Sequence, residues 1–247
     1  MPDVIYSRSG PFSAALLAGR LKALTAKPWL MHLSDPWSGS PYRQLFPRAA
    51  ARDLALEAKC FENADLITLT TEGQANYYRA RYHERSGAIH VTSNMMPAIL
   101  SPTAPRRRQE RLRLVYTGAF YGDRNPSTLL RALRYLYDQA PDAEGRIHLD
   151  FYGNIPSEMA AEICETPGCF VHGPIPFATV AEKQAQADVL VTIEPGGEHP
   201  LLLHFMPSKN LDYIAAGKPI LAITPKGSET DRLCRLGHGW AFDPSDV

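Results

Sequence analysis

The sequence lacks a long apolar run, since no stretch approaches the roughly 20 residues that a helix needs to cross a bilayer. It also lacks a secretion leader, because the opening MPDVIYSRSG has neither a basic start nor an apolar core. An excess of one charge is missing too, as 26 basic residues balance 26 acidic ones. No strong field therefore attracts nucleic acid. These absences predict a cytoplasmic protein without a transmembrane segment or a nucleic-acid partner, and they leave peripheral membrane contact open.

Cysteine is scarce, and the four thiols are scattered along 247 residues. Cys164 and Cys169 lie close in the chain, but no second Cys or His pair completes a zinc-binding spacing. We therefore predict reduced thiols and no metal site. The glycine fingerprint G-x-G-x-x-G of dinucleotide-binding folds is also missing. Its absence argues against an NAD- or FAD-dependent enzyme, and we predict no cofactor.

What the chain does contain is a regular alternation of short apolar segments with helical patterns. Ser127–Gln139 shows the helical pattern most clearly, because its leucines recur on one stripe. Strands this apolar cannot face water, so they predict parallel sheets with helices on both faces, an α/β fold. The predicted strands are Val4–Tyr6, Trp29–His32, Leu66–Thr70, Ile89–Thr92, Leu112–Tyr116, Ile147–Tyr152, Phe170–His172, Val189–Ile193 and Pro219–Ile223.

A proline-rich, basic stretch divides the strands into two series. It contains Pro97, Pro102 and Pro105, followed by Arg106–Arg108. Proline removes backbone donors and the arginines repel one another, so the stretch is typical of an exposed linker. Phosphate or lipid head-group binding by the arginines is the alternative. We predict one domain over 1–100, a linker over 101–111 and a second domain over 112–247.

The segment from Pro207 to Pro219 combines capping signals with unusual charges. Ser208 occupies an expected N-cap, a short helix is predicted to reach Ala216, and Gly217 suits the left-handed position that ends it. The helix start would lie at the carboxyl edge of a parallel sheet, where α/β proteins bind ligands.

Two side chains of this predicted helix favour ligand binding. Lys209 in the first turn opposes the helix dipole but would complete a diphosphate site. Asp212 lies four residues after Ser208, near the same face of the helix, and could accept two hydrogen bonds from a ribose diol. A capped surface helix with an incidental lysine and aspartate is the alternative.

This segment, PSKNLDYIAAGKP, resembles the donor-binding signature P-S-K-x-x-E-Y-x-A-x-G-K-P of retaining glycosyltransferases of family 4. Asp212 stands in the place of the signature's glutamate. In the family's fuller pattern two glutamates are separated by seven residues, and His204 stands where the first of them would be. The resemblance implies the GT-B fold, two Rossmann-like parallel-sheet domains. It further implies that the N-terminal domain is incomplete and that this chain is shorter than the family's enzymes at both ends.

The resemblance also assigns roles to residues outside the segment. For the donor, it implies that Gly118 and Arg124 contact the diphosphate. Gly153 and the loop containing Ile175 would contact the nucleotide, and Ser208, Lys209 and Asp212 would complete the binding site. For the acceptor side, it implies that the loop after the second strand faces the donor. His32 and Asp35 of that loop are the expected catalytic residues.

The function that follows from the resemblance is retaining, metal-independent transfer of a sugar from a UDP- or GDP-type nucleotide sugar to an acceptor hydroxyl. A sugar or glycolipid acceptor and a place in polysaccharide biosynthesis are expected. Two alternatives stay open: a sugar-nucleotide epimerase of the same fold, and a non-catalytic nucleotide-sugar-binding or scaffold fragment. His204 and the short ends of the chain favour the last of these.

Overall fold

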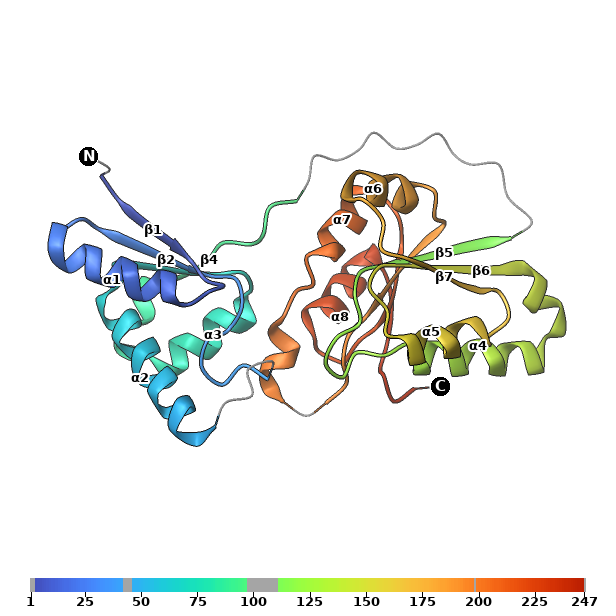
Figure 1. Ribbon diagram of the computed structural model, residues 1–247, viewed down its shortest axis with the longest axis horizontal. Helices are drawn as coiled ribbons and strands as arrows, with labels where there is room; N and C mark the ends of the chain where they lie inside the picture. Colours follow the sequence, from blue (N-terminus) through green and yellow to red (C-terminus); the bar gives the residue numbers. More distant parts are fainter. Residues whose placement is uncertain (1–2, 42–45, 97–110, 198, 247) are drawn as a thin grey trace. The chain divides into compact units, whose positions relative to one another are not determined.

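The computed structural model describes residues 3–41, 46–96, 111–197 and 199–246 and contains two α/β units (Figure 1). The first unit comprises Met1–Asn94 together with His199–Met206. The second comprises Met95–Glu198 and Pro207–Val247. His199–Met206 therefore groups with the first unit, although it lies within the predicted domain 112–247. Residues 101–110 of the predicted linker, with its three arginines, lie outside the described residues.

The first unit is built on a four-stranded parallel sheet in the order β1-β2-β3-β4. Each strand coincides with a predicted apolar segment to within two residues at either end. The strands are β1 (Ile5–Arg8), β2 (Trp29–Leu33), β3 (Leu66–Leu69) and β4 (Ile89–Val91). The helices are α1 (Ser13–Thr25), α2 (Pro47–Asn63), α3 (Glu72–Arg81) and the 3₁₀ segments η1 (His83–Ala88) and η3 (Pro200–His204).

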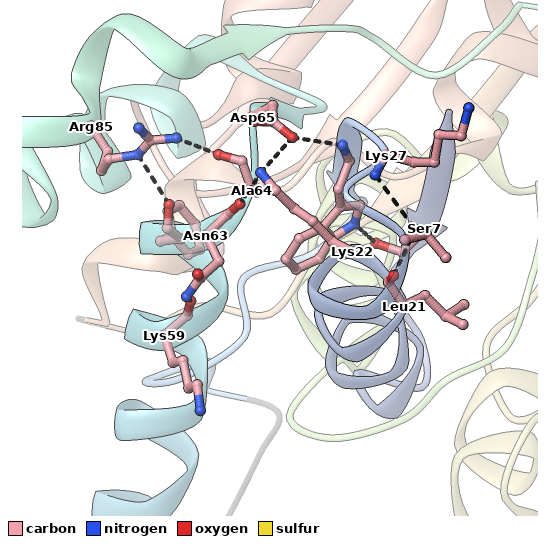
Figure 2. A network of polar contacts seen from close by, with 12 residues as sticks. Ser7, Leu21, Lys22, Lys27, Lys59, Asn63, Ala64, Asp65 and Arg85 are labelled. Carbon is pink, nitrogen blue, oxygen red and sulfur yellow. Dashed lines mark hydrogen bonds and ion pairs between the residues drawn. The ribbon is translucent and has the colours of Figure 1, made fainter. Parts of the chain in front are cut away.

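An aspartate after the last turn of α2 fastens the start of the next strand to its neighbour (Figure 2). The Asp65 carboxylate accepts the backbone N–H of Trp29 at 2.7 Å and faces the Lys22 ammonium at 2.6 Å. The guanidinium of Arg85 donates to the carbonyl of Ala64 beside it. These contacts fix the loop that joins α2 to β3.

A second carboxylate of the first unit is buried and fully engaged. Glu57, on α2, has no exposed side-chain surface. Its oxygens accept the backbone N–H of Ser38 at 2.6 Å and the Ser38 hydroxyl at 2.8 Å. The hydroxyls of Tyr78 and Tyr82 donate to it at 3.1 Å and 2.7 Å. Four hydrogen bonds stabilise the buried charge, so this carboxylate joins α2, α3 and the loop after β2 into one core.

The second unit contains a six-stranded parallel sheet in the order β10-β9-β8-β5-β6-β7. The strands are β5 (Leu112–Thr117), β6 (Ile147–Tyr152), β7 (Cys169–Gly173), β8 (Val189–Ile193), β9 (Ile220–Ile223) and β10 (Gly239–Phe242). The helical segments are α4 (Ser127–Gln139), η2 (Pro141–Arg146), α5 (Ser157–Cys164), α6 (Phe177–Ala185), α7 (Lys209–Ala215), α8 (Glu229–Leu233) and the π-helical turn η4 (Cys234–His238).

This order is that of a doubly wound Rossmann sheet, in which the chain starts at the centre and reverses direction once. The reversal falls between β5 and β8, which are neighbours in the sheet. Helices α4 and α5 pack on one face of this sheet, and α7 and α8 pack on the other (Figure 1). Two parallel sheets covered by helices confirm the predicted fold class.

Strand β10 lies at the edge of the second sheet and was not predicted, because its residues alternate between half-buried and exposed positions. No helix in the described part of the chain is long and apolar enough to cross a membrane.

Candidate functional site

The reversal point of the second sheet carries a pocket at the carboxyl ends of the strands. Four residues predicted from the sequence to bind the donor lie in its wall, namely Gly118, Gly153, Ile175 and Asp212. The pocket encloses about 240 Å³ and is further lined by Thr117, Tyr152, Pro174, Val180 and Gln184. Ligands of doubly wound folds bind in this position, so the structure brings most of the predicted donor residues together where the fold favours a ligand.

The floor of the pocket requires glycine at one position. A Cβ on Gly153 would lie 1.8 Å from the carbonyl oxygen of Gly118, and φ at Gly153 is +137°. The N–H of Gly118 in turn donates to the carbonyl of Tyr152 at 2.9 Å. Any side chain at Gly153 would therefore push the two loops apart. The close approach leaves backbone, rather than side chains, facing the pocket.

Lys209 places a buried positive charge next to these glycines. Its ammonium nitrogen lies 3.9 Å from the centre of the Tyr116 ring and 3.5 Å from where a Cβ on Gly118 would be. It has no hydrogen-bond partner within the described residues. Burial lowers the pKa of Lys209 well below its usual value, and repulsion from Arg124 lowers it further. An unsatisfied buried ammonium is costly for folding, so its position indicates a ligand.

Arg124, in the loop between β5 and α4, supplies a second cation. It is 8% exposed, and one terminal nitrogen donates to the carbonyl of Ala119 at 3.4 Å. Its guanidinium lies 4.5 Å from the centre of the Tyr121 ring. The Nε–H is buried and finds no acceptor among the residues described. Because Arg124 and Lys209 affect each other electrostatically, a phosphate-sized anion beside them would meet two charges.

Glu194 is a functional candidate that the sequence analysis missed. It follows β8 directly, and its carboxyl is buried with the two cations. Burial raises the pKa of Glu194 to about 7, although hydrogen bonds from Thr230 and Thr224 and the nearby cations oppose the rise. One carboxyl oxygen, Oε1, has no partner in the described part of the chain. A carboxylate directly after a strand with four apolar residues out of five was the available signal.

Ser208 does not cap α7 as predicted. Its backbone is helical, with φ −56° and ψ −33°, and its side chain makes no capping hydrogen bond. Helix α7 instead opens with two tight turns, in which the N–H groups of Asn210 and Leu211 bind the carbonyls three residues earlier. The prediction of an N-cap was therefore wrong. The predicted end of the helix is confirmed, since Gly217 adopts φ +65°.

Tyr213 fixes α7 in place of a cap. Its buried hydroxyl donates to the carbonyl of Val191 at 3.1 Å and accepts the N–H of Thr117 at 3.2 Å. It thereby joins α7 to both strands that flank the reversal point. Gln184 donates to the Thr117 hydroxyl at 3.1 Å from α6. The tyrosine of the motif therefore positions Lys209 and Asp212 beside the pocket.

Asp212 carries the acceptor group of the pocket. Its side chain is half-buried, and desolvation raises the pKa of its carboxyl. The carboxylate lines the same cavity as Ile175 and Gly153. A carboxylate at a pocket wall can accept two hydrogen bonds from neighbouring hydroxyls.

The two predicted catalytic residues belong to the first unit, on and just after β2. His32 is buried, and its Nδ1 lies 2.9 Å from the Thr68 hydroxyl. Desolvation lowers the pKa of His32, and the charge of Arg8 lowers it further. Asp35 is exposed in the following loop; partial desolvation raises the pKa of its carboxyl, while Arg8 opposes the rise.

His204 also belongs to the first unit. Its carbonyl accepts hydrogen bonds from the Thr71 hydroxyl at 2.9 Å and the Gln74 amide at 3.2 Å. Both donors lie at the start of α3, so η3 and its neighbours pack on that helix. The sequence suggested His204 as the counterpart of a glutamate that contacts the donor sugar in the family. Its backbone carbonyl holds His199–Met206 against α3.

No protein-family model matches the chain, and no curated protein matches it by sequence. Solved structures do match. The chain is similar to an α,α-trehalose-phosphate synthase (UDP-forming) from Burkholderia vietnamiensis, with a TM-score of 0.65 and 13% identity over 100% of this chain and 64% of that one. It is similar to WaaG, a glycosyltransferase involved in lipopolysaccharide biosynthesis, with a TM-score of 0.57 and 16% identity over 94% and 69%.

A third similar structure is the pneumococcal O-GlcNAc transferase GtfA in complex with UDP and GlcNAc. Here the TM-score is 0.59 and the identity 11%, over 92% of this chain and 43% of that one. The chain thus spans between less than half and about two thirds of these proteins. At such low identity the likeness establishes the fold alone, which is the two-unit GT-B fold of these transferases.

Proposed function

We propose that the chain transfers a sugar, with retention of configuration, from a UDP- or GDP-type nucleotide sugar to a hydroxyl of a sugar or glycolipid acceptor. The observation that carries this proposal is the pair of buried cations, Lys209 and Arg124, whose Nζ and Nε atoms have no hydrogen-bond partner among the described residues. The similar structures add support, since one is UDP-forming and another holds UDP and GlcNAc.

The proposed chemistry follows from where these charges lie. When the bond between sugar and diphosphate breaks, negative charge grows on the leaving phosphate. Lys209 and Arg124 would stabilise that charge from a buried position, where electrostatic interactions are stronger than in water. These two cations offer the stabilisation that a metal ion gives in other transferases, so we propose a metal-independent reaction.

The remaining pocket residues would hold the nucleotide. Asp212 would accept hydrogen bonds from the ribose hydroxyls, and the open floor at Gly153 and Gly118 would let the diphosphate approach the backbone. Asp35 is the proposed partner of the acceptor hydroxyl, because its carboxylate is exposed. His32 is buried against Thr68, so we propose that it shapes the strand end that carries Asp35.

Calorimetric titration with UDP and with GDP tests the donor site. Lys209→Ala should weaken binding about 10- to 150-fold, equivalent to roughly 1.5–3 kcal/mol for a charge-assisted hydrogen bond. Lys218→Ala is the matched control, since Lys218 precedes β9 at the opposite end of the strands and should leave affinity unchanged. If neither nucleotide binds the native protein, the proposed function is wrong.

Product analysis then separates transfer from its alternatives. A donor sugar joined to an added acceptor, with turnover unaffected by a chelator, would support metal-independent transfer. An altered sugar nucleotide formed without an acceptor would instead indicate an epimerase. Tight nucleotide binding without any product would indicate a binding or scaffold protein.

A further inference from the structure

We infer that Glu194 is the charge-balancing residue of the donor site: it is an anion while the site is empty and takes up a proton when the diphosphate binds. The inference rests on the proposed function, because Glu194 interacts electrostatically with the two cations that would hold the diphosphate. It assigns a role to a residue for which the resemblance gives none. Glu194 acts through Lys209 and Arg124 and is therefore a positioning residue.

Three buried polar atoms without hydrogen-bond partners gather at one edge of the second sheet. They are Oε1 of Glu194, Nζ of Lys209 and Nε of Arg124, each with no partner among the described residues. They come from three separate segments, the end of β8, the start of α7 and the loop after β5. Each of the two cations affects the carboxyl electrostatically. The three groups therefore form one buried cluster.

The surroundings of Glu194 contain few other charges. The second carboxyl oxygen is held by the hydroxyls of Thr230 and Thr224, and Asn210 donates to Thr230 at 2.8 Å from α7. The thiol of Cys234 feels the carboxylate from the end of α8. Across a neighbouring cavity of about 350 Å³, the charged lining groups are Asp123 and Arg131.

Charge balance predicts what a diphosphate does to this cluster. In the empty site the carboxylate favours the charged form of Lys209, since Glu194 raises the pKa of the lysine against the larger lowering by burial. The diphosphate of a nucleotide sugar brings two negative charges, which match the two cations and leave the carboxylate in excess. UDP brings three at pH 8, so the excess of negative charge is larger still. A buried excess charge is strongly unfavourable, and protonation removes it. The proton comes from solvent to Oε1, and it returns when the nucleotide leaves.

The size of the effect follows from the empty state. With the pKa of Glu194 at about 7, the carboxyl is about 90% ionised at pH 8 in the empty site. Because the diphosphate raises this pKa further, binding at pH 8 should take up about 0.9 proton. Affinity should then fall about tenfold for each pH unit above 7.

The test is calorimetric titration of the whole protein with UDP at pH 8, in Tris and in HEPES, whose ionisation enthalpies differ. The terminal phosphate of UDP is almost fully ionised at this pH, because its second pKa lies near 6. The wild-type protein should take up about 0.9 proton per UDP bound. Glu194→Gln should take up less than about a quarter of this, and its affinity should be flat from pH 7 to 8.5.

Lys209 is the other group that could take up a proton, and the same variant separates the two. Removing the Glu194 charge lowers the pKa of Lys209 further, because Glu194 raises it in the native site. If Lys209 were the proton acceptor, Glu194→Gln would therefore increase the uptake. An increase in proton uptake would overturn the inference. Unchanged proton uptake would overturn it too, because that is the result expected if Glu194 were merely structural.

A second variant keeps the test decisive if Glu194→Gln does not fold. Lys209→Arg holds a charge that does not titrate, so proton uptake should persist in it. Its loss would assign the proton to Lys209. UDP binding by the native protein without any proton uptake would overturn the role of Glu194 and leave the proposed function standing. Absence of binding by both UDP and GDP would instead remove the proposed function itself.

Discussion

The two units each bury one glutamate, and the contrast between them separates a structural carboxylate from a functional one. Glu57 in the first unit receives four hydrogen bonds, two from Ser38 and one each from two tyrosines. Glu194 in the second unit is also buried, yet one of its oxygens has no partner among the residues described. Nζ of Lys209 and Nε of Arg124 also lack a hydrogen-bond partner among the described residues.

Burial alone therefore does not indicate function in this molecule. A buried charge whose donors are all present stabilises the arrangement around it, because removing any member leaves another unsatisfied. Buried charges that lack partners lower stability, and a fold retains them where a ligand completes the set. By this criterion we propose the reversal point of the second sheet as the ligand site.

The largest expected effect on the free energy of unfolding is that of replacing Glu57. Glu57→Ala would leave two tyrosine hydroxyls and two donors of Ser38 without their acceptor, so it should lower the free energy of unfolding by about 3–5 kcal/mol. Chemical denaturation followed by circular dichroism measures the change. The exposed Glu62→Ala on the same helix is the control and should change stability by less than about 0.5 kcal/mol. A small effect at Glu57 would break the comparison.

The ionised carboxylate of Glu194, unlike that of Glu57, is expected to lower the free energy of unfolding, and this effect depends on pH. Its pKa is about 7 in the folded protein against a usual value of 4.5. The folded state therefore holds the proton more tightly, so the stability this gives is present below pH 4.5 and is lost as pH rises through 7. The loss is on the order of 3 kcal/mol by pH 8.

Glu194→Gln should remove this pH dependence. Without ligand, the variant should resemble the native protein near pH 5 and exceed it in stability at pH 8. Denaturant midpoints measured at pH 5, 6.5 and 8 give the comparison. A native protein whose stability does not fall between pH 5 and 8 relative to the variant would contradict the assignment of a raised pKa.

The elements that were predicted well owe their form to local signals. Helix α4 begins and ends at the predicted residues because its leucine stripe has a helical period over its whole length. The interior strands β6 and β8 also match, since both faces of an interior strand are buried and apolar residues predominate in both, although β6 contains His148 and Asp150 and β8 contains Thr192. Gly118, Gly153, Ile175 and Asp212 met at one pocket because strand ends of a parallel sheet share an edge.

What was missed depends on contacts between distant residues. Strand β10 has no continuous apolar run, and Gly239 at its start is needed because a Cβ there would lie 1.9 Å from the carbonyl oxygen of Ile220. The Ser208 cap failed because Tyr213, anchored on β5 and β8, fixes the helix instead. The charge of Glu194 was visible in the sequence, but its burial with Lys209 follows only from the assembled sheet.

The smallest expected effect on stability concerns a contact that both units share, an aspartate that accepts a backbone N–H at or near the start of a neighbouring strand. Asp65 accepts the N–H of Trp29 at the start of β2, and Asp188 accepts the N–H of Arg113 near the start of β5, at 2.7 Å and 2.8 Å. Asp65→Asn and Asp188→Asn should each cost about 0.5–1.5 kcal/mol, as for one hydrogen bond. The ion pair of Asp65 with Lys22 adds little because the carboxylate is half exposed. Denaturation of both variants should show similar losses, since these aspartates support the shared scaffold, and a large difference would show that the units differ beyond their buried glutamates.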